Sequence, residues 1–164
     1  MTQKGFIIAE SMIPHRRRMR LIERIKNPDQ HGLQAETTVR DVWPMYEDGA
    51  VSSIICIELI AQSVSAFSTW LRGSGASPRV GFLVGIKTAE FNSATLPIDI
   101  DLTVTVAKIS KVGNYGVFKG EVSSGSSSFC QAVLQVIEPD KNTLQRFKEQ
   151  TPGFRGYGYG VIGE

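Results

Sequence analysis

The chain has 164 residues, of which 41% are hydrophobic and 21% charged, and its net charge is only +2. This length suits one domain with a sizeable core, and so small a net charge argues against a nucleic-acid-binding protein. Cys56 and Cys130 both lie in apolar stretches, so we expect two buried free thiols and a reducing, cytoplasmic location. We expect no signal peptide, because the N-terminal apolar patch is short and the basic run at residues 15–18 follows it instead of preceding it. We also expect no membrane span, because no apolar stretch reaches the roughly 18 residues that a span requires.

The first half of the chain predicts two strands and then a long helix. Residues 19–27 and 32–41 show partial period-2 alternation and are separated by turn residues, which predicts two antiparallel strands. From about Ala50 to Arg72 the apolar residues fall on nearly every side, which is typical of a central helix, here on the order of 30 Å long. Ser52 or Ser53 is placed to cap its start, and the sequence GSGASP would end it.

The second half predicts four strands joined by short turns, over residues 79–91, 98–110, 115–124 and 128–138. The clearest alternation puts Leu102, Val104 and Val106 on one face. Strands joined in this way form an antiparallel sheet. We therefore predict an α+β domain in which a curved antiparallel sheet wraps around one long central helix. One sheet covers only one side of a helix that is apolar all round, so we also predict a dimer.

The C-terminal part differs from the rest. We expect one domain over residues 1–141 and an extension over residues 142–164, which ends in FRGYGYGVIGE and has no readable period. The extension is either a flexible terminus or an arm that crosses to a partner subunit.

Three stretches carry a family resemblance: IPHRRRMRLIERI (13–25), IELIAQSVSAF (57–67) and VGFLVGIKTAEFN (80–92). In order and spacing they resemble the motifs LPHRxPxLLxDRV, xEAxAQ and FLxGIxxAxF of the β-hydroxyacyl-acyl-carrier-protein dehydratases. The stretch YEDGAVSSIICIELIAQSVSAF is similar to the aryl-polyene branch of these proteins, whose motif reads about DGxVPAWVGIEYMAQ. The resemblance covers most of residues 13–138 and implies the dimeric hot-dog fold.

The resemblance also implies a role for Glu58, the carboxylate in the middle of the predicted helix. In the family, the matching carboxylate and a His of the neighbouring subunit remove water from a β-hydroxyacyl thioester, which requires an acid and a base. In the family, the helix N-terminus points its N–H groups at the thioester carbonyl, and here these groups would come from around Ser53 and Ile54. The alternative for Glu58 is a polar residue that faces a crevice or pairs with a charge. The candidate substrate-binding residues are Trp43, Ser53, Ile54, Gln62, Phe82 and Leu83.

The sequence departs from the family at the catalytic His. Trp43 and Pro44 stand where the two family motifs place it. His15 belongs to the IPHR motif, where the resemblance implies a structural role, and His31 lies in a predicted turn. We therefore expect a chain that is poor or inactive as a dehydratase on its own. Tyr46 and Asp48 are possible substitutes for the missing residue, with Tyr46 as a candidate replacement acid.

Three functions remain open. The resemblance implies a (3R)-hydroxyacyl-acyl-carrier-protein dehydratase-like protein of fatty-acid or polyene biosynthesis. The alternatives are a non-catalytic subunit that binds acyl thioesters or pairs with an active chain, and a hot-dog thioesterase. The expected partners are an acyl carrier protein or coenzyme A thioester and a second subunit, either a copy of this chain or a His-bearing homologue. We expect no cofactor and no metal. The basic run HRRR either forms a solvated strand edge or attracts an acidic acyl carrier protein.

Overall fold

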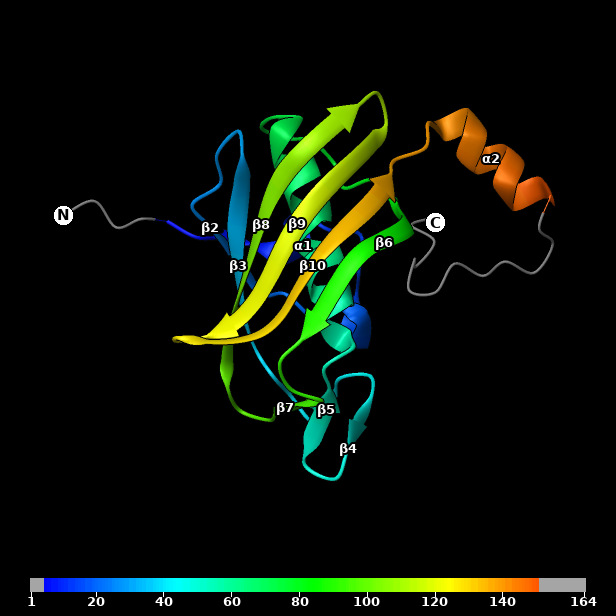
Figure 1. Cartoon of the computed structure of the whole chain (residues 1–164). Helices are drawn as coiled ribbons and strands as arrows, with labels where there is room; N and C mark the ends of the chain where they lie inside the picture. Colours follow the sequence, from blue (N-terminus) through cyan, green and yellow to red (C-terminus); the bar gives the residue numbers. More distant parts are fainter. Residues whose placement is uncertain (1–4, 151–164) are drawn as a thin grey trace.

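The computed structural model describes residues 5–150, and its main feature is a long helix, α1 (Ile55–Leu71), that lies across one face of a curved antiparallel sheet (Figure 1). In spatial order the seven strands of this sheet are β1 (Ile7–Ile8), β2 (Arg24–Lys26), β3 (Gly32–Thr38), β8 (Asp101–Val112), β9 (Tyr115–Ser124), β10 (Ser127–Ile137) and β6 (Phe82–Phe91). Every neighbouring pair is antiparallel. The predicted α+β arrangement of sheet and helix is confirmed.

The core lies between α1 and the inner face of the sheet. The alternation predicted for β8 is present, since Leu102, Val104 and Val106 are all buried. Phe67 of α1 meets Phe118 of β9 edge to face, with ring centroids 6.2 Å apart. Aromatic pairs prefer this geometry because the positive edge of one ring faces the negative face of the other. Contacts of this kind fix how α1 lies on the sheet.

The two cysteines belong to the same core. Cys56 on α1 and Cys130 on β10 are both buried, and neither takes part in a disulfide. The prediction of buried free thiols is therefore confirmed. Among the described residues, none of the helices is long and apolar enough to cross a lipid bilayer.

The ends of α1 were predicted with unequal success. The helix ends where expected, because Gly73 takes a backbone φ of +98° that favours glycine and donates its N–H to the carbonyl of Trp70. The predicted start at Ala50 is wrong. Residues 50–52 form the strand β5 (Ala50–Ser52), and the N-cap position is Ile54, with no side-chain cap. Neither Ser52 nor Ser53 caps the helix.

A small second sheet explains this difference. β5 pairs with β4 (Tyr46–Glu47) on one side and with β7 (Thr95–Pro97) on the other. These strands lie beyond one end of the main sheet, next to the start of α1 (Figure 1). Pairing with a segment that is distant in the chain overrides the local helical pattern of residues 50–52.

Two further elements were not predicted as such. The segment before β2 contains short 3₁₀ turns, η1 (Ala9–Ser11) and η2 (Arg17–Met19), so β2 is shorter than the strand expected over residues 19–27. The helix α2 (Lys141–Gln150) occupies the first part of the expected C-terminal extension. The rest of that extension, for which we expected a flexible terminus or a crossing arm, lies outside the described residues.

Candidate active site

The candidate site is centred on Glu58, in the N-terminal half of α1. Its side chain is 33% exposed, although its helical neighbours Leu59 and Ile60 are fully buried. Burial raises the pKa of the Glu58 carboxyl above its ordinary value, and a hydrogen bond from Gln62 offsets part of that rise. A carboxyl with a raised pKa holds its proton closer to neutral pH, which suits a proton donor.

Gln62 lies one turn after Glu58 and fixes the position of its carboxylate. The Gln62 Nε2 donates to Glu58 Oε1 at 2.9 Å and to the carbonyl of Met19 at 2.6 Å. Its Oε1 accepts the backbone N–H of Leu21 at 2.9 Å. Gln62 is completely buried, so these bonds tie α1 to the segment before β2 and leave Glu58 little freedom at that oxygen.

His15 lies against the same carboxylate, which the sequence interpretation did not anticipate. Its Nε2 is 3.3 Å from Glu58 Oε1, and its side chain is only 14% exposed. The guanidinium of Arg16 folds back and donates to the carbonyls of Ile13 and His15 itself, at 2.6 and 2.8 Å. Burial, and next the positive charge of Arg16, lower the pKa of His15 from 6.5 to about 4. The imidazole is therefore uncharged at neutral pH.

A cavity of about 130 Å³ opens beside this pair. Its walls come from α1, from the residues just before β6 and from the facing ends of β6 and β10. The lining residues that matter here are His15, Glu58, Arg79, Phe82, Leu83 and Glu138. The structure thus places two of the sequence-predicted substrate residues, Phe82 and Leu83, together with the predicted carboxylate.

The family model for ApeP-like proteins, described as ApeP dehydratase, matches residues 7–149. This chain belongs to the ApeP-like dehydratase family. The sequence resemblance to the aryl-polyene branch of hot-dog dehydratases is thereby confirmed. No curated protein sequence gives a significant match.

Solved structures share the fold of this ApeP-like chain. A chain of the dehydratase heterocomplex ApeI:P from Xenorhabdus doucetiae matches with a TM-score of 0.80 and 21% identity, over 87% of this chain and 98% of that chain. A hypothetical thioesterase with coenzyme A from Streptococcus pneumoniae matches with a TM-score of 0.55 and 12% identity, over 70% and 86% of the two chains. Cj0977, a virulence protein from Campylobacter jejuni, matches with a TM-score of 0.57 and 11% identity, over 81% of this chain and 89% of that chain. Together these matches confirm the predicted hot-dog fold.

Four further residues predicted from the sequence do not line the cavity, namely Trp43, Tyr46, Ser53 and Ile54. Trp43 is 4% exposed and belongs to the hydrophobic core, and Tyr46 is 40% exposed on β4. Ile54 is 55% exposed at the start of α1. The backbone N–H of Ser53 already donates to the carbonyl of Ala94 at 2.9 Å. Of the two N–H groups that the resemblance placed at the thioester carbonyl, the one at Ser53 is therefore engaged elsewhere.

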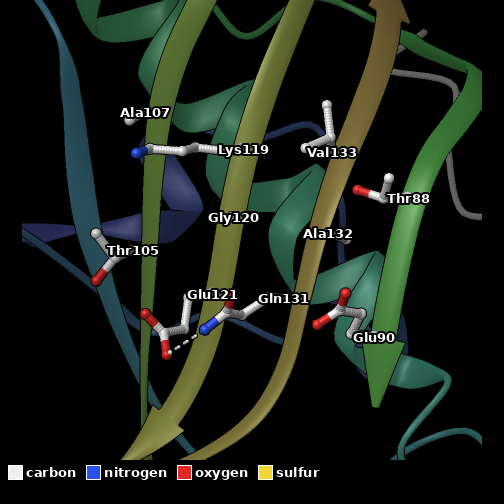
Figure 2. A pocket seen from close by; sticks show the side chains of 10 residues that line it. All are labelled: Thr88, Glu90, Thr105, Ala107, Lys119, Gly120, Glu121, Gln131, Ala132 and Val133. Carbon is white, nitrogen blue, oxygen red and sulfur yellow. Dashed lines mark hydrogen bonds between the residues drawn. The ribbon is translucent and has the colours of Figure 1, made fainter.

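A larger hollow, of about 400 Å³, lies on the sheet face opposite α1. Figure 2 shows its side chains on β8, β9, β10 and β6 with α1 behind the sheet, among them Thr105, Lys119, Glu121 and Glu90. Glu121 accepts a hydrogen bond from Gln131 at 3.3 Å (Figure 2). The hollow is open and shares no lining residue with the cavity beside Glu58.

Proposed function

We propose that this chain is one subunit of a dehydratase that removes water from (3R)-hydroxyacyl thioesters carried by an acyl carrier protein. The observation that carries the proposal is the Glu58 carboxyl: it is held by Gln62, its pKa is raised by burial, and it opens into a cavity beside β6. Membership of the ApeP-like dehydratase family supports the reaction type. The choice of an acyl-carrier thioester rests on the sequence motifs.

In the proposed reaction, Glu58 is the general acid. A base removes a proton from the carbon next to the thioester carbonyl, and that C–H electron pair becomes the new double bond. The bond to the β-hydroxyl breaks as Glu58 gives it a proton, and water leaves. A carboxyl group of ordinary pKa would be almost fully ionised at neutral pH, so a raised pKa is what this role requires.

The base is assigned to a second, homologous chain. At the position where the family carries its His, this chain has Trp43 and Pro44, neither of which titrates. His15 lies on the same side as Glu58, in contact with the acid itself. A base is needed across the substrate from the acid, and the matched structure from Xenorhabdus doucetiae is a dehydratase heterocomplex. We therefore assign the base to a His-bearing partner subunit.

The surface for that partner is centred on β6. This strand is at one end of the sheet order, and Leu83, Val84 and Ile86 are 42%, 56% and 48% exposed. A long edge strand with exposed apolar side chains pairs readily with another chain. Phe82 and Leu83 of the same strand line the cavity, so a chain added at β6 would extend the site from 130 Å³ toward a tunnel that admits an acyl chain.

Turnover of a crotonyl-type thioester, measured in the hydration direction, tests the proposal. The assembly is isolated from its native cells through a tag on this chain, and the chain is also assayed alone. We expect the assembly to hydrate the thioester and the chain alone to be slow. Glu58→Gln should lower kcat of the assembly by about 10²- to 10⁴-fold, the usual contribution of a general acid.

The control is Glu47→Gln, which changes an exposed carboxylate on β4 and should leave turnover unchanged. Full activity in Glu58→Gln would overturn the proposed acid. Full activity of the chain alone would overturn the need for a partner. Release of free thiol without hydration would instead identify a thioesterase.

A further inference from the structure

One oxygen of the Glu58 carboxylate is surrounded by nitrogen atoms, and the other is not. Oε1 lies 2.9 Å from Gln62 Nε2 and 3.3 Å from His15 Nε2. Within residues 5–150, Oε2 makes no hydrogen bond. The two oxygens of this carboxylate are therefore not equivalent, and the second is the one available to a substrate in the cavity.

Both nitrogen atoms are held in place by groups outside the side chain that carries them. Gln62 is fixed by its bonds to Leu21 and Met19. The backbone of His15 is fixed by Arg16, whose guanidinium bonds the carbonyls on either side of Pro14. Ile13, two residues before His15, is fully buried and anchors the segment in the core. Two fixed donors on one oxygen define the orientation of a carboxyl group.

We propose that His15 is a positioning residue for Glu58: its neutral imidazole donates Nε2–H to Oε1 and so keeps Oε2, with the catalytic proton, directed at the substrate. This inference rests on the proposed function, in which Glu58 is the acid. It assigns a role to a histidine that belongs to the same chain as the carboxylate and that sequence motifs had marked as structural.

The charge state of His15 matters for this role. A charged imidazolium at 3.3 Å would stabilise the ionised carboxylate, lower the pKa of Glu58 and remove its proton. Burial and the neighbouring Arg16 keep His15 uncharged at neutral pH. The other charged groups at the cavity are Arg79 and Glu138, and Glu138 is paired with Arg72 at 3.0 Å. A neutral donor orients the Glu58 carboxyl group without removing its proton.

The test uses four variants of the assembly in the hydration assay. His15→Gln keeps an N–H donor, His15→Leu removes it at similar size, and Glu58→Gln removes the acid. His31→Leu is the matched control, because His31 is the other histidine of the chain and lies exposed in the turn before β3. We expect His15→Leu to lower kcat by about 10- to 100-fold with little change in KM, since a misplaced catalytic group costs this much. His15→Gln should retain most activity.

The pH profile supplies a readout that a merely structural role would not change. Loss of a donor to the carboxylate raises the pKa of Glu58. When the profile is measured in the dehydration direction, where Glu58 must carry its proton, the alkaline limb of kcat should therefore move to higher pH in His15→Leu and stay in place in His15→Gln. Thermal melts of each variant show whether it has folded, and His15→Met, which also lacks a hydrogen-bond donor, replaces His15→Leu in the comparison with wild type if the latter has not.

Each other outcome has one meaning. Unchanged kcat and unchanged pH profile in a folded His15→Leu variant would overturn the inference while the proposed function stands. If His15→Gln is as damaged as Glu58→Gln and loses the acid limb of the profile, His15 is itself a base, and the positioning role is wrong. If Glu58→Gln is fully active, the proposed function fails first, whatever the His15 variants do.

Discussion

The side-chain oxygen of Gln62 accepts the backbone N–H of Leu21 at 2.9 Å, so the middle of α1 is tied directly to the segment that leads into β2. The amide nitrogen of the same residue holds Glu58. One buried amide therefore serves both the fold and the candidate site. Its loss should affect stability and turnover together, whereas loss of the Glu58 carboxyl should affect turnover more than stability.

Gln62→Leu should therefore destabilise the chain. The substitution leaves the N–H of Leu21 and the carbonyl of Met19 without their side-chain partner, and a buried unsatisfied group costs about 1–3 kcal/mol. Urea unfolding measures the change in the free energy of unfolding. Gln131→Leu is the control, because Gln131 lies exposed on the outer sheet face and should change stability by less than about 0.5 kcal/mol. Equal effects of the two variants would contradict the assigned role of Gln62.

The stability of the chain should depend on pH through His15. Its pKa is about 4 in the folded chain against 6.5 for an ordinary histidine, so between these values the unfolded chain binds more protons. The contribution of His15 to the free energy of unfolding is fully present above pH 6.5 and is lost as the pH falls toward 4. Its upper size is about 3 kcal/mol, at 1.36 kcal/mol per pKa unit.

The measurement requires a background without Glu58, because the raised pKa of that carboxyl acts in the opposite direction. Urea unfolding of Glu58→Gln is compared with that of Glu58→Gln/His15→Gln at pH 7 and pH 4.5. The first variant should lose more stability at low pH than the second. Arg16, Arg79 and Glu138, the other charged groups near the imidazole, are the same in both variants. If both variants lose the same amount of stability between pH 7 and pH 4.5, His15 is not desolvated in the folded chain.

Sequence alone predicts the strands of this chain where one face is buried. In the first half of β8 and the second half of β9 every second residue is buried, so the period is visible in the sequence itself. The start of α1 and the contact of His15 with Glu58 could not be found in this way. Both depend on segments that are far apart in the chain and meet only in the folded structure. The IPHR motif marks His15 as notable but does not say which side chain it faces.

The exposed apolar residues of β6 should be required for assembly. Val84→Asp puts a charge where the side chain is 56% exposed on the edge strand, and burying an unpaired charge in an interface is costly. We expect the variant to elute as a monomer in size-exclusion chromatography with light scattering, under conditions where wild type is an assembly. Val112→Asp, at a position that is 77% exposed at the end of β8, is the control and should assemble normally. Normal assembly of Val84→Asp would move the interface away from β6.

Gly120 on β9 should tolerate no side chain, because α1 lies directly over it. A Cβ at this position would overlap the side chain of Ile60, whereas a Cβ at Gly5 would meet nothing within 4 Å. Gly120→Ala should therefore destabilise the chain by about 1–3 kcal/mol, the usual cost of overpacking a core. Gly5→Ala is the control and should be neutral in the same denaturation experiment. A neutral Gly120→Ala would mean that α1 can shift away from the sheet at low cost.

Replacing Trp43 by histidine tests whether the missing catalytic residue can be restored at that position. Trp43 is 4% exposed, is packed in the hydrophobic core and does not line the cavity beside Glu58. We expect Trp43→His to lower stability, by at most the about 3–5 kcal/mol that truncation of a buried Trp to Ala costs, and to give the chain alone no new turnover. Tyr46→His makes a similar change at a residue that is 40% exposed on β4 and should cost little stability. Turnover by Trp43→His alone would show that position 43 does face the substrate, and that the lost histidine is the reason why the chain needs a partner.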